Sequence, residues 1–257
     1  IGGTFTDFVL VDADEQRIHL HKCLTTPRDP SQGALTGLTE LLGRVGVSIG
    51  DIGHIVHGTT LVTNAIIERS GCKLGFLTTK GFRDILEMGT EQRYDIHDLF
   101  LEFPAPLSPR RWRREIDERI TRDGDIVTPL DIDQARRQVD ALVAEGVEAI
   151  AVCLLHAYKN PVHEQAIRDL LRTEYPQMAI SISSEVYPEL KEFERSSTTA
   201  ANAYVQPLMS AYVEKLETAL ARLGFQGRFH LMQSSGGLTA PSTAIELPVR
   251  FLESGPA

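Results

Sequence analysis

Ile1-Gly2-Gly3-Thr4-Phe5-Thr6-Asp7 opens the chain and continues directly into the apolar stretch Phe8-Val9-Leu10-Val11. Two adjacent glycines allow a tight turn and let backbone N–H groups approach a ligand closely. Thr4 and Thr6 place two hydroxyls on the same side of an extended chain. This pattern has two interpretations, an ordinary glycine hairpin or a loop that cradles a phosphate. The rest of the sequence has to decide between them.

The composition favours a globular protein and argues against two classes of partner. The 257 residues are 42% hydrophobic, and the net charge of −9 argues against a general nucleic-acid or anionic-membrane surface. The longest apolar run, residues 149–155, is far too short for a membrane span. Three widely spaced cysteines show no metal-ligand spacing and indicate reduced thiols. We therefore expect a soluble, cytoplasmic protein.

Hydrophobic periodicity predicts an α/β fold. A second strand over 17–24 would complete an opening hairpin, and apolar residues at helical spacing predict helices near 30–42, 61–69, 82–88, 132–143 and 161–171. Short apolar runs predict strands at 52–56, 73–79, 149–155, 179–183 and 229–232. A long helical pattern covers 189–223. Helices and strands alternate through most of the chain, as in α/β proteins.

Residues 89–131 differ from this pattern because they carry four prolines and many charges. We interpret them as a long excursion outside the core. The basic run Arg110 to Arg114 is followed at once by acidic residues, and a solvated or subunit-facing patch is expected there.

Glycine and threonine follow the end of several predicted strands. His57-Gly58-Thr59-Thr60 lies between a strand and a helix, Gln233 to Gly237 forms a second such turn, and the last residues offer a third. In open α/β sheets, ligands bind at strand ends of this kind.

Several of these stretches together resemble the hydantoinase A/5-oxoprolinase family, which includes an ATP-dependent acetone carboxylase subunit. The resemblance rests on stretches in the same order as in the family and covers essentially the whole chain. These are 1–7 (the family's DIGGTFTD without its leading Asp), HGTTLVTNA at 57–65, TTKGFRD at 78–84, 185–205 with ERSSTTAANAY, MQS at 232–234 and SGPA at 254–257. Ser235 stands where the family more often has Asn.

The resemblance implies the actin-like ATPase fold, built from ribonuclease-H-like domains that close on ATP and Mg²⁺. An N-terminal domain would span 1–185, with the excursion at 89–131, and 186–257 would begin a second, truncated domain. The chain starts inside the glycine motif and stops in an apparent loop. We therefore expect it to be part of a longer polypeptide that works with a hydantoinase B-type subunit or domain as an oligomer.

The resemblance also suggests roles for individual residues. Residues expected to contact phosphate are Gly2, Gly3, Thr4, Thr6, Thr59, Thr60, Ser254 and Gly255. Asp7 is the candidate for Mg²⁺, or else caps the hairpin. The candidate catalytic residues are His57, Arg93 and Glu194. Each has a structural alternative: a satisfied buried histidine, a surface ion pair, and an acidic residue that suits a helix N-terminus.

Three functions remain open at this point. The first is ATP-dependent ring opening of a cyclic amide such as a hydantoin or 5-oxoproline, in which phosphorylation of the amide oxygen creates a leaving group. The second is ketone carboxylation of the acetone carboxylase kind. The third is a non-catalytic assembly module, and the fragment alone is expected to be inactive.

Overall fold

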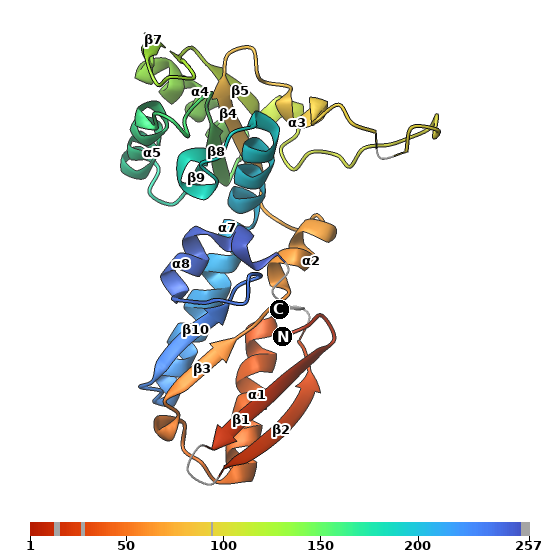
Figure 1. Ribbon diagram of the computed structural model, residues 1–257. Helices are drawn as coiled ribbons and strands as arrows, with labels where there is room; N and C mark the ends of the chain where they lie inside the picture. Colours follow the sequence, from red (N-terminus) through yellow and green to blue (C-terminus); the bar gives the residue numbers. More distant parts are fainter. Residues whose placement is uncertain (13–15, 27–28, 94, 253–257) are drawn as a thin grey trace. The chain divides into compact units, whose positions relative to one another are not determined.

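The computed structural model describes residues 1–257 except 13–15, 27–28, 94 and 253–257. The chain divides into two compact units that are interleaved in sequence (Figure 1). Unit 1 comprises residues 1–70 and 208–257, and unit 2 comprises residues 71–207. The long helix α7 (Glu192–Leu223) contributes to both. The division at 185/186 concerns the domains of the family that the sequence resembles, and it stays a prediction.

Unit 1 begins with the predicted hairpin. β1 (Phe5–Asp12) pairs antiparallel with β2 (Arg17–Leu24) over their full length. Helix α1 (Pro30–Val45) packs on this hairpin; it starts with Pro30 at its first position and ends at Gly46 in the left-handed conformation. The opening hairpin is thus confirmed.

The remaining strands of unit 1 form a second sheet with the order β11-β10-β3. β3 (His54–His57) is parallel to β10 (Arg228–Met232), and β11 (Leu238–Thr239) is antiparallel to β10. Short helices complete the unit: η1 (Ile49–Asp51), α2 (Leu61–Ile67), α8 (Pro241–Glu246) and η3 (Pro248–Phe251).

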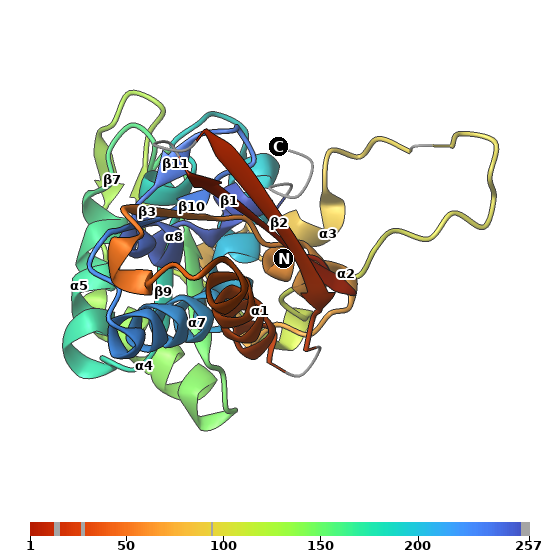
Figure 2. The same ribbon diagram turned by 90° about the horizontal axis from the view of Figure 1, so that it is seen from below.

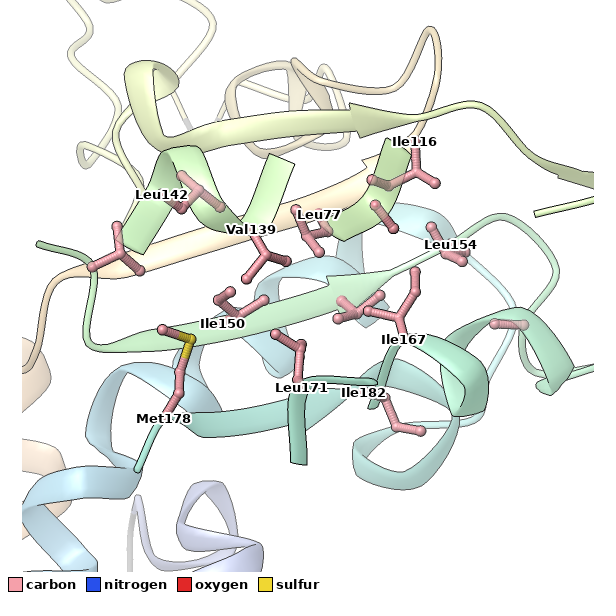
Figure 3. Packing of buried hydrophobic residues seen from close by; sticks show 14 residues of the cluster. Leu77, Ile116, Val139, Leu142, Ile150, Leu154, Ile167, Leu171, Met178 and Ile182 are labelled. Carbon is pink, nitrogen blue, oxygen red and sulfur yellow. The ribbon is translucent and has the colours of Figure 1, made fainter. Parts of the chain in front are cut away.

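Unit 2 is built on a parallel sheet with the order β5-β4-β8-β9. The strands are β4 (Leu74–Thr79), β5 (Arg113–Ile116), β8 (Ala149–Cys153) and β9 (Ala179–Ile182). Every residue of β4 and β8 is buried, as expected for central strands of a parallel sheet. Helices α4 (Ile132–Ala144) and α5 (Val162–Glu174) supply the rest of its core, which Figure 3 shows around Leu77, Val139 and Ile150.

Smaller elements of unit 2 are α3 (Ile85–Met88), η2 (Arg110–Trp112), the β6–β7 pair (Arg119–Ile120 and Ile126–Thr128) and α6 (Ser183–Val186). Between α3 and η2, the described residues 91–93 and 95–107 extend away from the sheet of their own unit (Figures 1 and 2).

The predicted excursion is wrong for its second half. β5 lies within it, yet it pairs with β4 in the central sheet and buries Ile116 completely. Arg113, expected on a solvated patch, is also fully buried; its guanidinium binds Glu87 at 2.5 Å and the Ser108 carbonyl oxygen at 2.9 Å. A buried arginine is tolerated when its donors are paired in this way.

Candidate functional site

Gly3 and Thr4 form a glycine turn directly before β1, at the open end of the β1–β2 hairpin. The Gly2 N–H donates to the Phe5 carbonyl oxygen at 2.9 Å, which closes a two-residue turn. Thr25 fixes the other side, because its N–H donates to the Thr4 carbonyl and its hydroxyl to the Gly2 carbonyl, both at 2.9 Å. The loop is therefore held from two directions before any ligand arrives.

Hydrogen bonds at Ile1 bring this glycine turn beside the second glycine and threonine motif. The Ile1 amino group donates to the Gly58 carbonyl at 2.6 Å, and the Thr60 N–H donates to the Ile1 carbonyl at 3.1 Å. A Cβ added to Gly3 would lie 3.6 Å from Asn64 Nδ2. Two motifs separated by more than fifty residues thus meet within unit 1.

The threonines of the two motifs differ in accessibility. Thr6 is buried and its hydroxyl pairs with that of Thr25 at 2.9 Å. Thr59 is also buried and accepts the Leu61 N–H at 3.2 Å. Thr4 is exposed, and Thr60 is partly buried with its hydroxyl 3.3 Å from Asn64 Nδ2. Thr4 and Thr60 are consequently the hydroxyls best placed to reach a ligand.

His57 lies directly behind this site. Its Nε2 is 2.7 Å from the Tyr212 hydroxyl, and its ring contacts those of Tyr212 and Phe229. Burial, assisted by the Ile1 ammonium, lowers the pKa of His57 to about 3. Burial likewise raises the pKa of the Tyr212 hydroxyl. At neutral pH both groups are uncharged, and a neutral imidazole with a satisfied partner matches the structural alternative for His57.

Asp7 lies on the exposed side of the hairpin, where Lys22 Nζ binds its carboxylate at 2.7 Å. Within the described residues no group of three or more His, Cys, Asp or Glu side chains could hold a metal ion. Mg²⁺ commonly needs only one or two carboxylates when phosphate oxygens and water supply its other ligands. Asp7 fits that limited role, provided that Lys22 moves away from it.

The other predicted site residues are described within their own part of the chain. Arg93 and Glu194 belong to unit 2. Arg93 is exposed on the 91–107 segment and donates to the Asp98 carbonyl at 2.8 Å, whereas Glu194 lies 3.5 Å from Lys191 Nζ in the first turn of α7. Ser254 and Gly255 lie outside the described residues.

Two residues of the site escaped the sequence analysis, Thr25 and Tyr212. The hairpin register places Thr25 opposite Thr4, so the predicted strand pairing contained a signal for it. Tyr212 is 155 residues from His57, and no local pattern links the two. Only the tertiary fold brings the His57 ring and the Tyr212 hydroxyl together.

The chain is similar in sequence to proteins of one family. Residues 1–175 match the model of the hydantoinase/oxoprolinase N-terminal region, and residues 195–257 match that of hydantoinase/oxoprolinase. The caprolactamase subunit alpha of Pseudomonas jessenii is 36% identical over 100% of this chain and 38% of its own length.

Two solved structures share the fold of the chain. The crystal structure of the ATP-dependent caprolactamase from Pseudomonas jessenii is similar with a TM-score of 0.89 and 34% identity. A nucleotide-free acetone carboxylase structure, from work on ATP-dependent acetone carboxylation, is similar with a TM-score of 0.87 and 28% identity. Each comparison covers 99% of this chain and 38% of the other. The chain therefore spans well under half the length of the proteins it resembles.

Proposed function

The chain belongs to the hydantoinase/oxoprolinase family, and from this premise we propose that it is the phosphate-binding part of a longer ATP-dependent enzyme that hydrolyses a cyclic amide. Relatives in this family include ATP-dependent enzymes of lactam hydrolysis and ketone carboxylation. The whole enzyme would have the actin-like ATPase architecture, to which unit 1 contributes the first phosphate loop.

One observation carries this proposal. The glycine turn at Gly2 and Gly3 is fixed beside Thr59 and Thr60 by the hydrogen bonds of Ile1. Glycines without obstructing side chains, exposed backbone at a turn and nearby hydroxyls are what a phosphate group requires. A purely structural hairpin has no need to meet a second glycine and threonine motif.

ATP would supply the phosphoryl group that converts the amide oxygen, normally a poor leaving group, into a good one. The chain's own residues would bind and orient the phosphates through backbone N–H groups of the turn and the hydroxyls of Thr4 and Thr60. Asp7 would be the carboxylate ligand for Mg²⁺, which neutralises phosphate charge. Arg93 and Glu194 are proposed to act on the substrate.

His57 would act in this scheme by positioning and not by proton transfer. A general acid or base works best with a pKa near the operating pH, whereas the His57 pKa is lowered to about 3. Its bond to Tyr212 instead holds the end of β3, from which Gly58 and Thr59 continue.

Ketone carboxylation is the second candidate, because the acetone carboxylase structure matches nearly as well. The identity of 34% to caprolactamase against 28% to acetone carboxylase favours the hydrolase. The relative's name, caprolactamase subunit alpha, supports a partner subunit, which we propose to be of the hydantoinase B type.

The experiment measures ATP hydrolysis by the full-length polypeptide together with its partner subunit. Each assay contains one candidate substrate: caprolactam, hydantoin, 5-oxoproline, or acetone plus bicarbonate. Stimulation by a cyclic amide is expected. Stimulation by the ketone alone would select the carboxylase, and no stimulation by any compound would contradict both.

A matched pair of variants tests the phosphate site itself. Thr4→Val removes the exposed hydroxyl of the glycine turn before β1 and is expected to weaken ATP binding about ten- to hundredfold, since a hydrogen bond to a charged group contributes about 1.5–3 kcal/mol. Thr39→Val, on the exposed face of α1, should leave ATP affinity unchanged. Equal affinities in calorimetric titrations of the two variants would remove Thr4 from the site.

A further inference from the structure

Unit 2 carries an arm, made of the described residues 91–93 and 95–107, that extends away from its central sheet (Figures 1 and 2). Ile96, Leu99 and Phe100 lie on this arm with exposed fractions of 70%, 84% and 88%. Among the residues that the structure describes, no other large hydrophobic side chain is as exposed as Leu99 or Phe100. Clustered exposure of this kind is typical of a protein interaction site.

The exposed apolar residues of the arm follow the spacing of one helix face. Ile96, Leu99, Phe100 and Phe103 stand at positions i, i+3, i+4 and i+7. Leu101 is the one apolar residue of 96–103 that falls outside this face. In the described part of the chain between α3 and η2, however, no helix is formed. The arm therefore has the pattern of an amphipathic helix without its structure.

Signals for the start and the end of a helix flank this apolar face. The Asp95 carboxylate accepts the His97 N–H at 2.9 Å, the bond that an N-cap residue makes to the second residue of a helix. Asp98 would lie in the first turn, where a carboxylate suits the helix dipole. Pro104 directly follows Phe103 and would end the helix there. The signals thus define a helix over 96–103.

Other hydrogen bonds hold the free arm in turns. The Asp98 carboxylate accepts the Phe100 N–H at 2.8 Å, and Arg93 donates to the Asp98 carbonyl at 2.8 Å. In a helix, the Phe100 N–H would bind the Ile96 carbonyl instead. A segment this short does not hold a helix by itself, since isolated helices below about 12–15 residues are marginal in water. An apolar surface that packs against the face would supply the missing stabilisation.

We propose that residues 95–103 are a docking segment that folds into a short amphipathic helix when its apolar face enters a groove on the partner subunit. That subunit is the one of the proposed function, on which this inference rests. Helices that bind in grooves use anchors at i, i+3, i+4 and i+7. Leu99 and Phe100 are the central anchors, because they have the most contact with water to lose. Docking would also release Arg93 from the Asp98 carbonyl and free its guanidinium for the substrate.

The charges of the arm define the edge of that groove. Carboxylates stand at Glu91, Asp95, Asp98 and Glu102, and besides His97 the only basic side chain within 91–107 is Arg93. Because interfaces pair opposite potentials, lysine or arginine side chains are expected at the edge of the groove. An anionic membrane would repel the arm. A second copy of the chain, with its net charge of −9, is a poorer match than a basic surface.

The test measures the affinity of the full-length polypeptide for its partner subunit by calorimetric titration. Leu99→Ser combined with Phe100→Ser removes the two central anchors and is expected to weaken binding by at least about a hundredfold, as for the truncation of hot-spot residues. Val127→Ser is the matched control, because Val127 is 64% exposed on β7 of the same unit. It should leave the affinity unchanged.

A second pair of variants tests the helix itself. Glu102→Pro keeps all four anchors but removes a helical hydrogen bond, and should weaken binding by at least about tenfold. Ala105→Pro lies beyond the end of the helix and should have no effect. In the wild-type protein, the amide hydrogens of residues 99–103 should exchange more slowly once the partner subunit is bound.

Four results separate this inference from its alternatives. Equal affinity of the serine variant and the wild type, or no complex at all, would overturn the docking role even where a cyclic amide stimulates ATP hydrolysis. A complex that depends on Leu99 and Phe100, without such stimulation, would support the docking segment and contradict the proposed function. A complex that tolerates Glu102→Pro would exclude the helix. Self-association that the serine variant abolishes, seen by sedimentation without the partner, would assign the arm to a second copy.

Discussion

At the scale of single residues, the neutral state of His57 couples the stability of unit 1 to pH. The ordinary histidine pKa of 6.5 applies in the unfolded chain, and burial lowers it to about 3 in the folded one. Between these values the unfolded chain binds more protons, so the stabilisation present above pH 6.5 is lost as the pH falls toward 3.

The expected loss on acidification from pH 6.5 to 5 is at most about 2 kcal/mol, at about 1.4 kcal/mol for each pH unit. Urea unfolding of the chain at several pH values measures it. His57→Gln should flatten this dependence, while His54→Gln, at the exposed start of the same strand, should keep it. A wild-type slope in His57→Gln would place the acid sensitivity elsewhere.

The candidate site was predictable from sequence only where the residue type itself carries the information. Paired glycines and clustered threonines mark a loop because few other residues allow its backbone to turn and approach a ligand. The buried state of Thr6 and the pairing of Thr25 and Tyr212 depend on which segments meet in space. The spacing of residues along the sequence does not show which segments meet in space.

At the scale of elements, the packing of α1 on the hairpin depends on Gly37. A Cβ at this position would lie 2.4 Å from Phe8 Cε2 and 2.8 Å from Cys23 Sγ. We expect Gly37→Ala to destabilise unit 1 by about 1–3 kcal/mol, because overpacking forces the hairpin and the helix apart.

The same helix provides the control for this substitution. Gly43 is exposed, and a Cβ there would meet nothing within 4 Å. Gly43→Ala should be neutral or stabilise by up to about 1 kcal/mol through helix propensity. Amide exchange of the β1 and β2 residues measures both variants, and equal effects would mean that the close approach at Gly37 is unimportant.

Arg113 gives a second prediction at this scale. It is fully buried at the start of β5, with Glu87 and the Ser108 carbonyl as its partners. Arg113→Ala is expected to destabilise unit 2 by about 2–5 kcal/mol, because it removes a large buried side chain and leaves the Ser108 carbonyl without its donor, whereas Glu87 is half exposed and stays solvated. Arg111→Ala, at an exposed position two residues earlier, should change stability by less than about 0.5 kcal/mol. Thermal unfolding of both variants distinguishes these outcomes.

The pattern around Arg113 shows why β5 was missed. Strand prediction relies on alternating or continuous apolar residues, yet β5 has the sequence Arg-Arg-Glu-Ile. Its place in the sheet comes from pairing with β4 and from partners that neutralise Arg113. The strongly apolar strands β4 and β8 and the amphipathic helices α4 and α5 follow their periodicity and were predicted.

At the scale of the whole molecule, the two units differ in how their cores are assembled. The core cluster of unit 2 is drawn from residues 77–182, all within one continuous segment. Unit 1 combines the start and the end of the chain, since Leu216, Leu220 and Phe229 line the same cavity as β1 and α1. Hydrophobic periodicity is local and does not record which distant segments share a core.

This difference predicts that residues 71–207 fold alone, whereas residues 1–70 do not. The isolated 71–207 fragment retains the core cluster of unit 2 and should show cooperative thermal unfolding and dispersed amide NMR signals. Residues 1–70 lose the leucines of α7 and the pairing of β3 with β10, and should lack such dispersion. Joining 1–70 to 208–257 with a flexible linker should restore it. A folded 1–70 fragment, or a 71–207 fragment without cooperative unfolding, would contradict the assignment of the two cores.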